Sequence, residues 1–142
     1  MIKETDLSEP IKSYFKQKGY QVQAEVKNCD IIASKNDELI VVELKTSANM
    51  TLLIQATARQ SISKHVYLAI PEPAKRKGTH WKGIVRVVSA LDLGLLVVNF
   101  NNGINQPVTL LMISVWVNRL YKVWQVIDLI KWLLAEKLMM LY

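Results

Sequence analysis

Three residues in the first third of the chain, Asp30, Glu43 and Lys45, combine two carboxylates with an amine. Two carboxylates held close together are destabilising unless a positive charge lies between them, either a metal ion or a lysine amine. Such oxygen ligands suit Mg²⁺, which usually binds one or two protein carboxylates and keeps several waters. The residue types therefore predict a divalent-cation site, if the fold brings the acids together. The alternative is a surface salt bridge worth less than ~1 kcal/mol.

A β-hairpin is the element expected to bring these acids together. Residues 29–35 and 39–46 are rich in Ile and Val, and Asn36-Asp37 between them tolerates the positive φ angles of a tight turn. With this dipeptide as the turn, counting back along both strands places Asp30 opposite Glu43, with Cβ atoms ~4.5–5.5 Å apart. Lys45 follows Glu43 by two residues and shares its face of the sheet. A slip of one residue would send Asp30 to the other face.

Hydrophobic spacing predicts the elements around this hairpin. They are expected in the following order: a helix over residues 7–18, a strand over 20–27, the hairpin, a helix over 50–63, a strand over 65–70, a helix over 81–91 and a strand over 95–100. Thr5, Asp6 or Ser8 could cap the first helix, and Pro10 fits only in its first turn, where a missing N–H costs nothing. Ser47 and Asn49 are possible caps for the second helix.

Composition and charge limit the class of protein. The chain has 142 residues, 51% of them hydrophobic, which is enough to bury a single-domain core. The net charge of +6 suggests a polyanionic partner, although proteins that bind nothing charged also carry such an excess. Cys29 is the only cysteine, so no intrachain disulfide can form, and two histidines give no zinc-finger spacing. No signal peptide is visible, and we expect a cytoplasmic location.

The last part of the chain differs from the rest, and we expect a domain over residues 1–103 and an apolar C-terminal appendage over 104–142. The appendage holds three of the four tryptophans, and its longest apolar run, residues 108–117, is well short of the ~20 residues of a spanning helix. No transmembrane span is expected. Further polar residues recur every third position and would wind around a helix: Arg119, Lys122, Gln125, Asp128 and Lys131. Such a helix needs cover from its own domain, a dimer partner or a membrane surface.

The hairpin, the strand before it and the helix after it resemble the core of the PD-(D/E)xK phosphodiesterase superfamily. That superfamily has a restriction-endonuclease-like α/β (α+β) fold, a mixed β-sheet flanked by helices in the order α-β-β-β-α-β-α-β. Asp30, Glu43 and Lys45 stand at its motif positions. Residues 4–71 also resemble a small bacterial branch of it, through ETDL, GYQVQAEVKNCDIIA, VVELK, the Gln55-Ala56 pair with Arg59, and HVYLAIP. The apolar tail departs from this branch, in which a polar, basic segment is expected.

The resemblance implies a metal-dependent nuclease that hydrolyses DNA phosphodiester bonds. Asp30 and Glu43 would bind Mg²⁺ or Mn²⁺, with the carbonyl of Leu44 as a third ligand. Lys45 would position or deprotonate the attacking water and stabilise the transition state. Gln55 would orient the site from the second helix. Glu25 and Glu4 are candidates for a second ion or for holding Lys45, or are solvated surface residues.

Basic residues would bind the DNA backbone beside such a site. The candidates are Lys75, Arg76, Lys77 and Arg59. Phosphate contacts of this kind make binding depend on salt. A solvated loop is the simpler explanation for the run at 75–77, and an exposed helix pair is the simpler one for Gln55 and Arg59. His65 and His80 are more consistent with structural or surface roles than with metal binding.

Two other functions compete with the nuclease. The first is a module that keeps this fold and binds nucleic acid without cutting it. The second is an assembly or membrane-surface protein that acts through its tail, including a homodimer joined by residues 104–142. An intact set of Asp30, Glu43 and Lys45 favours the enzyme over the first alternative.

Overall fold

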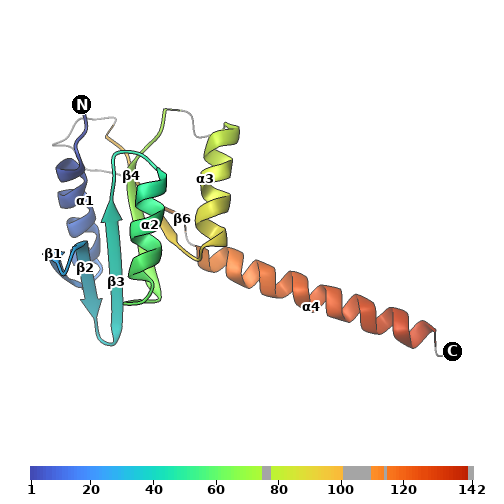
Figure 1. Cartoon of the computed structure of the whole chain (residues 1–142). Helices are drawn as coiled ribbons and strands as arrows, with labels where there is room; N and C mark the ends of the chain where they lie inside the picture. The colour runs from blue at the N-terminus through green and yellow to red at the C-terminus, as the bar shows by residue number, and fades with distance from the viewer. Residues whose placement is uncertain (75–77, 101–109, 114, 141–142) are drawn as a thin grey trace.

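In the computed structural model, the chain forms a mixed β-sheet with helices on both faces (Figure 1). The structure describes residues 1–74, 78–100, 110–113 and 115–140. Within these residues the sheet has six strands, which lie side by side in sequence order from β1 to β6. The mixed α/β class with flanking helices is confirmed.

The elements follow in the order expected from the sequence, with two further elements from the tail. They are α1 (Glu4–Gln17), β1 (Gln21–Val26), β2 (Cys29–Lys35), β3 (Glu38–Leu44), α2 (Met50–Arg59), β4 (His65–Pro71), α3 (Thr79–Ala90), β5 (Gly94–Val98), β6 (Leu110–Ile113) and α4 (Val115–Met139). The caps of α2 include Asn49, whose side-chain oxygen accepts a hydrogen bond from the backbone N–H of Leu52 at 2.9 Å.

Strands β1, β2 and β3 form the predicted antiparallel meander. Lys35 pairs with Glu38 across the second turn, where Asn36 has φ 53°, so the expected register is confirmed. In the first turn Lys27 and Asn28 both have positive φ angles, as a two-residue type I′ turn requires. Strands β3, β4 and β5 then run parallel through the crossover helices α2 and α3, and β6 returns antiparallel to β5.

Two hydrophobic layers cover the two faces of the sheet. On one face α1 packs through Leu7, Ile11 and Phe15 against the strands. On the other face α2 and α3 pack through a second cluster: Leu52, Ala56, Trp81 and Val88. Side chains of β3 point alternately into the two hydrophobic layers, because successive side chains of a strand face opposite sides of the sheet. This alternation places the odd-numbered residues of β3 under α2.

Helix α1 begins earlier than its sequence pattern predicts. The Asp6 carboxylate accepts a hydrogen bond from the backbone N–H of Lys3 at 2.8 Å, which starts the helix at Glu4. Pro10 therefore lies inside the helix, and the expectation of a first-turn position is wrong. An interior proline removes one backbone hydrogen bond and costs ~3 kcal/mol or more. The buried residues at Leu7 and Ile11 on either side of Pro10 offset this cost through their packing.

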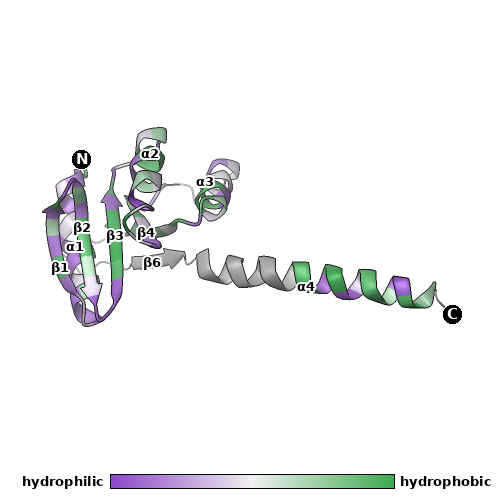
Figure 2. Cartoon of the chain, turned by 60° about the horizontal axis from the view of Figure 1, so that its bottom comes forward, coloured by the Kyte–Doolittle hydropathy of each residue, from purple (hydrophilic) through white to green (hydrophobic). Residues whose placement is uncertain are grey.

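Helix α4 extends away from the sheet and its flanking helices (Figure 2). Residues 126–140, which comprise the end of α4 and Met140, are all exposed and include ten large apolar side chains. These side chains therefore do not pack against the described part of the rest of the chain. Among the described helices, none is both long enough and apolar enough to cross a bilayer.

The ring of Tyr67 leaves no room for a side chain at Gly94 in β5. The two residues are paired across β4 and β5, and a Cβ added to Gly94 would overlap the ring of Tyr67. We expect Gly94→Ala to lower the free energy of unfolding by about 2 kcal/mol through overpacking. Urea denaturation of this variant and of the double variant Gly94→Ala/Tyr67→Leu checks the cause. The free energy of unfolding should fall less in the double variant than the sum of the decreases in the two single variants. If the decreases simply add, the steric explanation is wrong.

Candidate functional site

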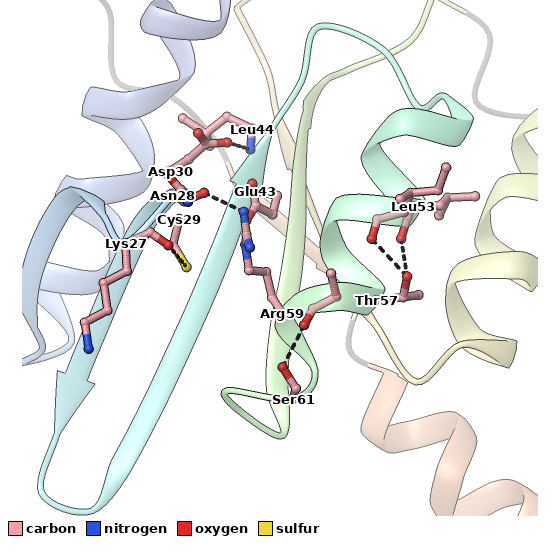
Figure 3. Close-up of polar contacts among 12 residues, drawn as sticks. Lys27, Asn28, Cys29, Asp30, Glu43, Leu44, Leu53, Thr57, Arg59 and Ser61 are labelled. Carbon is pink, nitrogen blue, oxygen red and sulfur yellow. Dashed lines mark hydrogen bonds and ion pairs between the residues drawn. The ribbon is translucent and has the colours of Figure 1, made fainter.

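The two acids of the hairpin lie together near the end of β3 (Figure 3). Ile31 pairs with Val42, so the next pair of the same register is Asp30 with Glu43. The Asp30 carboxylate accepts a hydrogen bond from the backbone N–H of Leu44 at 2.7 Å and also lies within hydrogen-bonding reach of Glu43. Glu43 is 2% exposed, whereas Asp30 is only partly buried. The juxtaposition predicted from the turn is confirmed.

Arg59 at the end of α2 joins this pair to the first turn of the meander (Figure 3). Its Nε donates to Glu43 Oε1 at 2.7 Å, and its Nη2 donates to the carbonyl of Asn28 at 2.6 Å. The sequence predicts a nucleic-acid contact for Arg59, which these intramolecular bonds do not test. They assign Arg59 a second role as the counter-ion of Glu43.

Burial and charge act in opposite directions on Glu43. Burial raises the pKa of its carboxyl, and the neighbouring charge of Asp30 raises it further, while the hydrogen bond from Arg59 lowers it. Burial is the largest of these effects, so the net direction is upward. The same hydrogen bond raises the pKa of the Arg59 guanidinium. The ionised form of Glu43 thus depends on the guanidinium beside it.

Lys45 follows β3 directly and is held by Glu4. Its Nζ lies 2.9 Å from Glu4 Oε1, and its backbone N–H donates to the carbonyl of Ala69 at 3.1 Å. The bond to Glu4 raises the pKa of Lys45, and the charges of Asp30 and Glu43 act in the same direction. All three of these contacts favour the protonated form of the Lys45 amine. Of the alternatives considered for Glu4, the structure shows the contact with Lys45, made from the first residue of α1.

The remaining predicted residues differ in how closely they approach the acid pair. Gln55 is partly buried and lies one helical turn before Arg59 on the same face of α2. Glu25 is exposed in β1 with φ 55°, between the pairs Ala24↔Ile31 and Val26↔Cys29. This position adjoins Asp30, but the left-handed backbone interrupts the pairing there. Lys75, Arg76 and Lys77 lie outside the described residues.

The acid pair supplies the two carboxylates that Mg²⁺ commonly uses, and in the described part of the chain no third acidic side chain joins them in a metal-binding cluster. Among the described residues, no cluster of three His, Cys, Asp or Glu side chains could hold a metal ion. Mg²⁺ commonly uses one or two carboxylates and completes its octahedron with waters and substrate oxygens. Asp30 and Glu43 fit that pattern, and the carbonyl of Leu44 would extend it.

A separate cavity lies between α2, β4 and α3. Its volume is about 400 Å³, and its walls are mainly apolar side chains, including Met50, Leu53, Ile84 and Val87. None of Asp30, Glu43 and Lys45 lines it. The cavity is therefore distinct from the acid pair.

Comparison of the chain with models of protein families, with curated protein sequences and with solved structures finds no match. The candidate site is accordingly defined by its own geometry.

Glu43→Gln is expected to stabilise the protein at neutral pH by about 1 kcal/mol, because the amide removes a buried charge and keeps an oxygen for Arg59. The pKa of Glu43 is raised above its ordinary value of 4.5, so the stability that this group contributes is present below pH 4.5 and is lost as pH rises through the raised pKa. The advantage of the variant is therefore largest near pH 7 and shrinks towards pH 4.5.

Urea denaturation at several pH values measures this difference. Glu9→Gln is the matched control, because the hydrogen bond and charge of Lys12 lower the pKa of the exposed Glu9 carboxyl. The control should give no stabilisation. A Glu43→Gln variant less stable than the wild type at pH 7 would show that the ion pair outweighs the cost of burial.

Proposed function

We propose that the chain is a metal-dependent nuclease of the PD-(D/E)xK superfamily, with a restriction-endonuclease-like core, that hydrolyses phosphodiester bonds in DNA. The observation that carries this proposal is the meeting of Asp30 and the buried Glu43 beside Lys45 at the end of β3. A buried carboxylate next to a second carboxylate is costly for the fold, which favours a functional reason for the arrangement.

The two acids would hold Mg²⁺ or Mn²⁺ together with the carbonyl of Leu44. A divalent cation bound there would make an attacking water more acidic and neutralise charge on the phosphate oxygens. The N–H of Leu44 already orients Asp30 for this role.

Lys45 would act as a fixed positive charge. Glu4 orients its ammonium group and keeps it protonated, which suits stabilisation of the negative charge that builds on the phosphate in the transition state. Gln55, one turn from Arg59, is placed to contribute a polar contact from α2.

DNA is the proposed partner because the chain is basic overall and the site chemistry fits a phosphodiester. The net charge is +6, and Lys75, Arg76 and Lys77 precede α3 in the sequence. Phosphate contacts by such residues supply sequence-independent affinity. A module of the same fold that binds nucleic acid without hydrolysis would share this affinity, so only a cleavage assay separates the two functions.

Lys45→Met should reduce metal-dependent DNA cleavage by about 10²–10³-fold, because it removes the charge that stabilises the transition state. The assay uses supercoiled, linear, branched and single-stranded DNA with Mg²⁺ or Mn²⁺, and EDTA should abolish cleavage. Lys12→Met, which removes a lysine paired with Glu9 on the surface of α1, is the matched control and should cleave like the wild type. Equal cleavage by Lys45→Met would contradict the assignment. DNA binding without cleavage of any substrate would favour the non-catalytic module.

The exposed apolar residues of α4 favour a second function, self-association of two copies through this helix. At 100° per residue, Val126, Ile127, Ile130, Leu133 and Leu134 lie within an arc of about 120°, which Lys137 also enters, and Asp128 lies opposite. The described charges of residues 126–140 balance, two acidic against two basic. These four charges can form pairs with a second copy of the helix.

Ile130→Glu/Leu133→Glu should convert a dimer into a monomer, because both substitutions place charge in the apolar side of α4. Light scattering of the full chain after size exclusion measures the mass. Asp128→Asn, on the opposite side of the same helix, should leave the dimer intact. A wild-type chain that is monomeric at tens of micromolar would refute self-association.

A further inference from the structure

Arg59 is the least exposed cation that contacts the acid pair. Its side chain is 19% exposed, and that of Glu43 is 2% exposed. It makes two charge-assisted hydrogen bonds, to Glu43 Oε1 and to the carbonyl of Asn28 (Figure 3). The negative charge of Asp30 also favours the charged guanidinium. Arg59 is thus electrostatically coupled to both acids, although it bonds to only one of them.

The other nearby cation cannot replace Arg59 in this role. Lys45 is bonded to Glu4, and its influence on Glu43 is that of a neighbouring charge rather than a direct partner. Among the described residues, the carboxylate pair therefore receives its direct compensation from one guanidinium, that of Arg59. A divalent cation bound by Asp30 and Glu43 would meet this guanidinium on the same carboxylate.

We propose that Arg59 is a built-in competitor of the divalent cation, compensating the acid pair in the metal-free protein and leaving Glu43 when the cation binds. The inference rests on the proposed metal site and adds a positioning residue to it. Two cations that share one partly buried carboxylate repel each other more strongly than in water. The coupling between the two cations is reciprocal. The free energy by which the metal weakens the bond between Arg59 and Glu43 equals the free energy by which Arg59 weakens metal binding.

The contact with Asn28 explains how Arg59 can leave Glu43 without being lost from the site. The carbonyl of Asn28 lies in the turn between β1 and β2, whose two positive φ angles fix its direction. This second hydrogen bond does not involve either acid. It can persist while the bond to Glu43 opens, so the release needs a rotation of the side chain rather than a movement of α2.

Calorimetric titration with Mn²⁺ tests the competition without relying on activity. Arg59→Gln removes the charge but keeps a donor for Glu43, and it should bind Mn²⁺ about tenfold more tightly than the wild type, within the usual range of coupling. Its melting temperature without metal should fall, and Mn²⁺ should raise it by more than in the wild type. Arg86→Gln, which removes an exposed arginine of α3, is the matched control and should behave like the wild type.

Each outcome of this titration has a distinct meaning. Equal or weaker Mn²⁺ binding by Arg59→Gln, with binding by the wild type, would overturn the competition and leave the metal site standing. If Arg59→Gln does not fold without metal, Arg59→Lys decides, because its single ammonium cannot reproduce both bonds. Arg59→Lys should bind Mn²⁺ a few-fold more tightly than the wild type, and equal or weaker binding would overturn the proposal. Absence of Mn²⁺ binding by all variants would overturn the proposed function as well.

Discussion

The burial of the Glu43 carboxylate is the constraint on which the arrangement of this protein depends. A carboxylate that is 2% exposed needs hydrogen bonds and an opposite charge, since its desolvation costs several kcal/mol. Arg59 supplies both from α2, and its second bond reaches the turn between β1 and β2. One side chain thereby ties the crossover helix to two parts of the meander. The position of α2 on the sheet is therefore set by charge as well as by the apolar contacts of Leu52 and Ala56.

The sheet order explains why the acids, the lysine and the arginine can meet. Strand β3 is antiparallel to β2 and parallel to β4, so it forms the boundary between the meander and the crossover units. Glu43 receives Asp30 from the antiparallel side and Arg59 from the helix that follows. Lys45 leaves the end of the same strand and reaches Glu4 on α1. The site thus draws on helices from both faces of the sheet.

Local chemistry made the hairpin predictable, because the turn at Asn36-Asp37 sets the register up to the pair Ile31 and Val42, and Asp30 and Glu43 follow directly on the two strands. The role of Arg59 was not predictable in the same way. The spacing between Gln55 and Arg59 shows only that they share one face of a helix. Which strand residue this face contacts depends on how the crossover helix packs on the sheet. Pro10 was misplaced because tertiary packing on both sides of it outweighs the local cost in α1. Strand β6 has no clear pattern of its own and forms through pairing with β5.

The left-handed backbone at Glu25 interrupts the outer edge of the sheet. Strand β1 is an edge strand in the described part of the chain, and an unpaired edge is a template on which other chains can add strands. The left-handed backbone at Glu25 breaks the flat row of N–H and C=O groups, while exposed Gln21 and Gln23 present polar side chains there. Addition of another strand is thereby disfavoured at this position of the edge.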